Sequence, residues 1–138
     1  MTTINLFKNE KDSLSIPAGR SIFFTGQTGD VMYVVIEGEV EIMVNNQLVE
    51  TIREGGIFGE MALLDEEPRS ADAIAKTDCK LATVNEKRFL YLVHNTPYFS
   101  IEIMRVMANR LRRENTVDRS TKAIRASSTV GAQATTRA

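Results

Sequence analysis

Short apolar runs alternate with glycine-containing turns through much of the first half of the chain. The run 39–44 shows the pattern best, because Val40, Ile42 and Val44 fall on one face of an extended strand. Residues 45–47, Asn-Asn-Gln, are expected to form a hairpin turn. Further strands are expected at 13–17, 21–24, 31–36, 48–52, 72–75 and 81–84. At least six short strands at this spacing predict a sandwich or jelly roll.

Helical periodicity replaces the strand pattern after residue 84. Asn85 is a typical helix N-cap, and Pro97 can open a second helix at its first turn. Apolar residues continue at helical spacing to about Asn115. The residues of the first helix that we expect to face the β-domain are Phe89, Leu90, Leu92 and Val93. Residues 116–138 are polar and are expected to be mostly disordered, after any continuation of the helix.

Composition restricts the class of protein. A chain of 138 residues with 43% hydrophobic residues is expected to form one domain, here at residues 1–115. The net charge of −1 predicts no general attraction to nucleic acid or to a membrane surface. The single cysteine, Cys79, fits a reducing compartment. No signal peptide and no apolar run of roughly 20 residues is visible, so a cytoplasmic location is predicted.

The stretch Phe58–Ala71 carries the clearest sign of a binding site. Glycines 55, 56 and 59 precede a short apolar segment, and converging backbone N–H groups there would suit an anion. Arg69 supplies a planar donor fork for phosphate, whereas the Glu60 carboxylate suits sugar hydroxyls. Together they predict a nucleotide. The alternative is a surface ion pair of Arg69 with Asp65, Glu66 or Glu67, worth about 0–1 kcal/mol.

The same stretch resembles the phosphate-binding cassette of the cyclic nucleotide-binding domain family. The match consists of Phe58-Gly59-Glu60-Met61-Ala62-Leu63, a five-residue spacer, and Arg69-Ser70-Ala71. Residues 29–38, GDVMYVVIEG, match a second element of the family. The resemblance covers about residues 10–115. It implies a mainly β fold, an eight-stranded jelly-roll barrel (a double-stranded β-helix), with a short cassette helix, an N-terminal helical segment and two C-terminal helices.

The resemblance also implies roles for individual residues. Arg69 would hold the phosphate oxygens, helped by Ser70 and by backbone N–H groups of Ala62 and Ala71. Glu60, with the Gly59 backbone, would take the ribose 2′-hydroxyl. The wall against ribose and base would come from Ile42, Val49 and Met61, although Ile42 and Val49 are equally well explained as barrel core. Base contacts would come from Glu114 or Asn115, or from a neighbouring arginine of the C-terminal helix. A serine at position 70 favours cyclic AMP and leaves cyclic GMP open.

Catalytic residue sets are missing from the sequence. Cupin enzymes share the jelly-roll shape but need several histidines on strands, whereas the one histidine here, His94, lies in an expected helix. No Ser–His–Asp set, Walker-type loop or paired metal ligands are present. We therefore expect a non-catalytic sensor with a cyclic nucleotide as ligand and no metal. The 23 residues after Asn115 are too few for a helix-turn-helix, so DNA binding is not expected.

Partners are less constrained by the sequence. Residues 101, 104, 108 and 111 recur at the coiled-coil interval, which fits either a homodimer through the C-terminal helix or packing on the chain's own barrel. An effector protein would be needed to receive the signal. The competing hypothesis is an interaction scaffold of the same fold whose pocket is vestigial or binds another anion. The chain is either a freestanding domain, which we favour, or a piece of a longer one.

Overall fold

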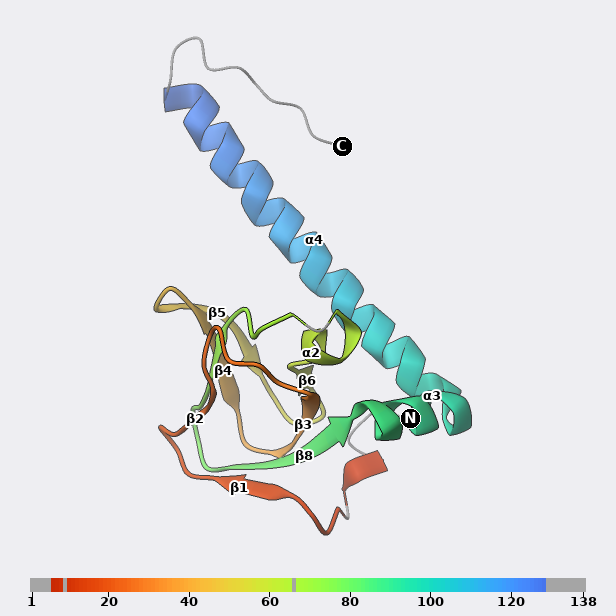
Figure 1. The fold of residues 1–138 in the computed structure, drawn as a ribbon. Helices are drawn as coiled ribbons and strands as arrows, with labels where there is room; N and C mark the ends of the chain where they lie inside the picture. Colours follow the sequence, from red (N-terminus) through yellow and green to blue (C-terminus); the bar gives the residue numbers. More distant parts are fainter. Residues whose placement is uncertain (1–5, 9, 66, 129–138) are drawn as a thin grey trace. The chain divides into compact units, whose positions relative to one another are not determined.

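The computed structural model describes residues 6–8, 10–65 and 67–128, with side chains described up to residue 113. The chain forms two compact units, Met1–Glu102 and Ile103–Ala138. The first unit holds the eight strands of the described part of the chain. Its elements, shown in Figure 1, are in chain order β1 (Leu14–Ile16), β2 (Ser21–Phe23), β3 (Val31–Glu37), β4 (Val40–Val44), β5 (Gln47–Ile52), β6 (Ile57–Phe58), α2 (Met61–Leu64), β7 (Asp72–Ala75), β8 (Cys79–Asn85) and α3 (Glu86–Asn95). The helix α4 (Pro97–Ser128) begins in this unit and continues into the second.

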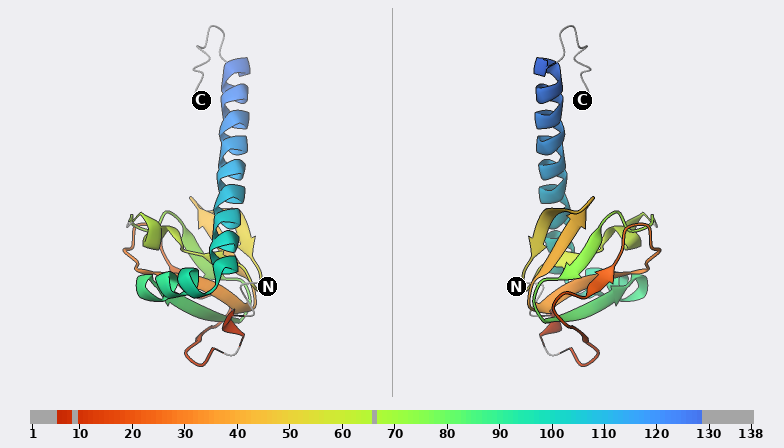
Figure 2. Two further views of the ribbon diagram at one scale, coloured as in Figure 1. Left: turned by 90° about the vertical axis from the view of Figure 1, so that its right-hand side faces the viewer. Right: turned by 90° about the vertical axis from the view of Figure 1, so that its left-hand side faces the viewer.

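The strands form two antiparallel four-stranded sheets (Figure 2). One sheet has the order β1-β8-β3-β6, and the other has the order β2-β7-β4-β5. Strands distant in sequence are therefore neighbours, as in a jelly roll. The mainly β fold with flanking helices is confirmed. In the part of the chain that the structure describes, the strand pairing gives two sheets and no closed barrel.

Both sheets contribute side chains to one apolar core. Its members on the first sheet include Val35, Phe58 and Leu81, and those on the second include Val40 and Ile52. All five are at most 3% exposed. Burial of this apolar surface holds the sheets together, at roughly 1.5–3 kcal/mol for each fully buried large side chain. Cys79 is part of the core and carries a free thiol.

The hairpin between β4 and β5 turns in two residues, not in the predicted three. Asn45 and Asn46 both have positive φ, 51° and 64°. A two-residue turn of the twist that strands prefer needs positive φ at both positions, and asparagine tolerates it well. Gln47 therefore already belongs to β5. The strand β6 was not among the expected strands, because two apolar residues between glycines give no periodicity.

The predicted helix starts are confirmed. The Asn85 side chain accepts a hydrogen bond from the Arg88 backbone N–H at 2.8 Å and thereby caps α3. Pro97 is the first residue of α4. On α3, Leu92 is buried as expected, but Leu90 is 59% exposed, so its predicted core position is wrong. The apolar stripe of α3 is narrower than the sequence suggested.

The C-terminal helix is longer than its apolar pattern predicted. It runs to Ser128, so the helix continues through residues 116–128, beyond the apolar periodicity that ends near Asn115. Residues 129–138 lie outside the described residues. The division into a domain at 1–115 and a tail at 116–138 stays a prediction. In the described part of the chain, none of the helices combines the length and the apolar character needed to cross a bilayer, and the cytoplasmic location also stays a prediction.

The N-terminal segment is joined to α3 by a charged contact. Leu6 and Phe7 are helical, which agrees with the expected N-terminal helical segment as far as the described residues reach. Arg88 donates hydrogen bonds to both carboxylate oxygens of Glu10, at 2.6 and 2.9 Å. Its guanidinium also lies 4.9 Å from the ring centroid of Phe7, which is fully buried. The contact raises the pKa of Arg88 and lowers that of Glu10.

Candidate functional site

The predicted cassette begins where β6 ends. Ile57 and Phe58 are buried, and their strand pairs with β3 through Val34 and Tyr33. Gly59 follows with a φ of +76°, a conformation that favours glycine, and turns the chain into α2. Glu60 stands at the N-cap of α2 and makes no side-chain capping hydrogen bond. The carboxylate of Glu60 is therefore not used to cap the helix, although it is only 4% exposed.

Arg69 is buried, with 7% of its surface exposed. Its Nη1 donates to the Gly59 carbonyl at 2.9 Å, and its Nη2 donates to the Val31 carbonyl at 2.8 Å. Among the side chains that the structure describes, Nε of Arg69 is the one buried nitrogen or oxygen without a hydrogen-bond partner. The expected alternative, a solvated surface ion pair of Arg69, is wrong because the side chain is directed inward to main-chain oxygens.

Two aromatic rings and two glycines surround the guanidinium. The Cζ atom of Arg69 lies 4.2 Å from the ring centroid of Phe23 and 5.7 Å from that of Tyr33. A Cβ atom on Gly29 would lie only 2.4 Å from Nη2 of Arg69, and one on Gly59 would lie 2.8 Å from Nη1. Glycine is therefore required at both positions for the arginine to sit as it does.

The electrostatics of the site reflect this burial. Desolvation lowers the pKa of the Arg69 guanidinium, while the nearby Tyr33, Asp30 and Glu60 act in the opposite direction. Desolvation is also the main reason that the pKa of Tyr33 is raised. Arginine stays protonated at physiological pH. A buried cation that donates to neutral carbonyls and whose Nε has no partner is well suited to an anion.

The remaining predicted residues lie around this centre. On the cassette, Ala62 is buried, Ala71 is half-buried and Ser70 is exposed, while Met61 is 46% exposed at the start of α2. Ile42 on β4 packs against the core, but Val49 on the adjacent β5 is 47% exposed and lies at a bulge opposite Ile42 and Met43. Ile42 is thus partly core, as the alternative explanation held, and Val49 is not. Glu114 and Asn115 lie outside the residues whose side chains are described.

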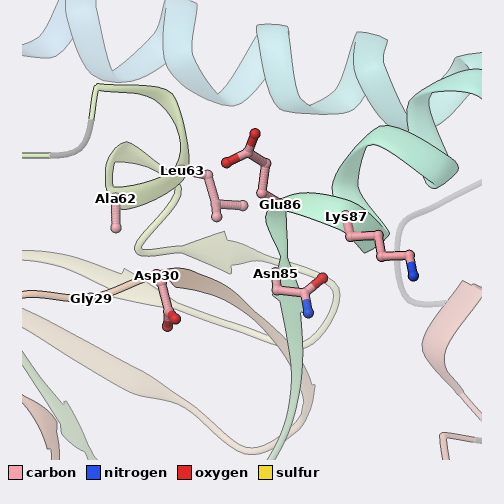
Figure 3. A pocket seen from close by; sticks show the side chains of 7 residues that line it. All are labelled: Gly29, Asp30, Ala62, Leu63, Asn85, Glu86 and Lys87. Atoms are coloured by element: carbon pink, nitrogen blue, oxygen red, sulfur yellow. The ribbon is translucent and has the colours of Figure 1, made fainter.

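A cavity of about 470 Å³ lies beside the cassette. It separates α2 from the end of β8 and the start of α3, as Figure 3 shows. Of the predicted site residues, Ala62 alone lines it; the other lining residues are Gly29, Asp30, Leu63, Asn85, Glu86 and Lys87. Gly29 lines the cavity and also lies against the Arg69 guanidinium. Gly29 thus lies between the cavity and the guanidinium of Arg69.

Three functional candidates were missed at the level of the sequence. Phe23 and the Val31 carbonyl contact Arg69 across 46 and 38 positions of the chain, so no local pattern could reveal them. Gly29 belongs to the second matching motif, but its role beside Arg69 depends on the three-dimensional path of the chain.

Comparison with protein families places this site in context. The family model described as "Cyclic nucleotide-binding domain" matches residues 13–96. This range contains β1 to α3 and therefore the whole cassette.

Individual relatives share the same region. The cAMP-dependent protein kinase regulatory subunit of Aspergillus fumigatus is 39% identical over 84 residues, which are 59% of this chain and 20% of the relative. The cyclic AMP receptor protein of Thermus thermophilus is 33% identical over 101 residues, which are 70% of this chain and 47% of the relative. The chain thus spans between a fifth and about half of these curated relatives.

A solved structure agrees with the sequence matches. The crystal structure of the Thermus thermophilus catabolite activator protein superposes with a TM-score of 0.73 at 28% sequence identity. The superposition covers 87% of this chain and 59% of that structure. The two-sheet arrangement and its flanking helices are therefore shared.

Proposed function

The chain belongs to the cyclic nucleotide-binding domain family, and we propose that it binds a cyclic nucleotide monophosphate and acts as a non-catalytic regulatory domain. In this proposal Arg69 binds the exocyclic phosphate, together with Ser70 and the backbone N–H groups of Ala62 and Ala71. Glu60 and the Gly59 backbone bind the ribose 2′-hydroxyl. Ile42, Val49 and Met61 contact the ribose and the base.

The observation that carries the proposal is the unused Nε donor of a buried Arg69. Leaving a buried N–H without a partner costs about 1–3 kcal/mol, and more when the group is charged. A phosphate oxygen would relieve this cost and neutralise the cation. Glu60, also buried, supplies an acceptor for a hydroxyl in the same cassette. A ligand that carries both a phosphate and a sugar hydroxyl matches the chemistry of both side chains.

Ligand capture is proposed to move the helices that follow the sheets. A ligand shifts a conformational equilibrium only if it binds the two conformations unequally. The cavity between α2 and the start of α3 leaves room for these elements to approach when the cassette closes on a phosphate. Figure 3 shows Leu63 of α2 directed toward the start of α3. We propose that α3 follows the cassette and that the C-terminal helix follows α3.

Cyclic AMP is the proposed ligand, ahead of cyclic GMP. The names of two relatives refer to cyclic AMP, namely the Aspergillus kinase subunit and the Thermus receptor protein. Serine at position 70 is compatible with this choice and can also serve guanine.

The output of the domain requires a partner, which we propose to be an effector protein or a second copy of the chain. Ile101, Met104 and Leu111 of α4 are exposed. Light scattering with and without cyclic AMP tests the homodimer, which a constant monomer mass would refute.

Calorimetry tests the proposed site. The wild type should bind cyclic AMP, and Arg69→Lys should lose the planar fork and with it about 1.5–3 kcal/mol, a ten- to hundredfold weaker Kd. Glu60→Gln should weaken binding of the ribose. The matched controls are Arg53→Lys and Glu54→Gln, because both residues are exposed and lie outside the cassette. They should leave the Kd unchanged.

The competing scaffold function predicts a different result. A ligand that binds only the folded form must raise the melting temperature. If neither cyclic nucleotide changes the melting temperature of the wild type, the sensor proposal fails and a scaffold with a vestigial pocket takes its place.

A further inference from the structure

The ring of Phe23 lies against the cation of the proposed phosphate site. The centroid distance to Cζ of Arg69 is 4.2 Å, which is shorter than the 5.7 Å to Tyr33. Phe23 and Arg69 are 8% and 7% exposed, so little water separates or screens them. A guanidinium within about 6 Å of an aromatic centroid is attracted by the ring quadrupole, and the attraction is strongest where both groups are desolvated.

We propose that Phe23 is a positioning residue for Arg69, and that its ring holds the guanidinium in place so that Nε remains available to a phosphate. The inference rests on the proposed function and adds to it a residue outside both matching motifs. Phe23 itself does not contact the ligand in this proposal. It acts through the arginine.

The two carbonyl hydrogen bonds do not fix the guanidinium alone. They restrain Nη1 and Nη2 at 2.9 and 2.8 Å, whereas Nε has no restraint from a hydrogen bond. Arginine has many rotamers, and ordering them on binding lowers affinity. A ring beneath the guanidinium restricts this freedom before the ligand arrives. The contact therefore acts by preorganisation.

The position of the ring is fixed by its own surroundings. Phe23 pairs with Ala73 of β7, so its backbone belongs to the second sheet. Its ring centroid lies 5.9 Å from the ring centroids of both Tyr33 and Phe58, which are 5.0 Å apart and stacked. These three rings come from β2, β3 and β6. A ring held by both sheets is a rigid support for a long side chain.

Fluorination of the Phe23 ring separates this role from plain packing. Successive fluorine atoms weaken the negative face of the ring and change its volume little. Calorimetry with cyclic AMP should give a Kd that rises with each fluorine, by about threefold or more for trifluorophenylalanine. The same substitution at Phe99 is the control, because that ring is 1% exposed and packs edge-on against Phe89. A Kd that is unchanged at Phe23, or raised equally at both positions, overturns the proposal.

A second measurement tests the contact without any ligand. Phe23→Leu, Arg69→Met and the double variant form a cycle whose unfolding equilibrium constants should deviate from additivity by about threefold or more. Additive effects would overturn the positioning role. If the wild type binds no cyclic nucleotide, the proposed function fails, and this cycle alone decides whether Phe23 holds Arg69.

Discussion

Replacing Gly29 by alanine should displace Arg69, the proposed phosphate-binding residue, while leaving the backbone unstrained. The φ angle of Gly29 lies outside the left-handed region, so alanine is compatible with its backbone. The added Cβ atom would, however, lie 2.4 Å from Nη2 and 2.5 Å from Cζ of Arg69. Ordinary contact begins at 3.4 Å, so the guanidinium must move by about 1 Å.

A displacement of this size is enough to break the arrangement of the donors. The hydrogen bonds of Arg69 to Gly59 and Val31 are 2.9 and 2.8 Å long, and lengthening by about 1 Å takes such bonds out of the usual range. Loss of a charge-assisted bond to phosphate costs about 1.5–3 kcal/mol. The Kd for cyclic AMP should therefore rise about ten- to a hundredfold.

The assay combines calorimetry with chemical denaturation, and Gly19→Ala is the control. Gly19 has a φ of +87°, and a Cβ atom added there would have nothing within 4 Å, so alanine is strained at this position but meets no side chain. This variant should lose about 1–2 kcal/mol of unfolding free energy and keep its affinity. A Gly29→Ala protein that binds cyclic AMP as tightly as the wild type would refute the assignment of Arg69.

Three further predictions concern other contacts. Glu10→Gln should destabilise the fold by about 1–2 kcal/mol at neutral pH, because it removes the charge from the pair with Arg88. The pair lowers the pKa of Glu10 in the folded state, so its stabilisation is present above the unfolded pKa of about 4.3 and is lost as the pH falls through the folded pKa. The unfolding free energies of the wild type and Glu10→Gln should therefore converge below about pH 4. A difference that stays constant with pH would contradict this explanation. Asn85→Ala should cost about 1 kcal/mol by uncapping α3, and Asn85→Asp should restore most of it, as measured by denaturation. Ser70→Thr should improve cyclic GMP affinity relative to cyclic AMP in paired titrations, and an unchanged ratio would remove position 70 from base selection.

Much of the fold could be predicted because its signals are local. Alternation in residues 39–44, glycine turns and the Asn85 cap are short-range patterns, and the structure places strands and helices accordingly. β6 was missed because its pairing with β3 is a tertiary effect on two residues. The full length of α4 could not be predicted, because residues 116–128 are helical but polar.

The candidate site, too, could be predicted only in part. Arg69 and Glu60 stand out in the sequence, since their residue types and spacing match a motif. The burial of both, the Phe23 ring and the unused Nε arise from segments far apart in the chain. Such features depend on how the sheets meet, and one-dimensional patterns do not contain that information.

The backbone carbonyl oxygens of residues 31 and 59 accept the hydrogen bonds of the Arg69 guanidinium, and every amino acid carries such an oxygen. The hydrogen bond to residue 31 consequently depends on the path of the main chain, and the side chain at position 31 takes no part in it. Substitutions at position 31 that preserve β3 should therefore leave the arginine in the same pose. The pose of Arg69 should then depend on the backbone of β3 at this position, and a change that bends or breaks the strand there should disturb the arginine.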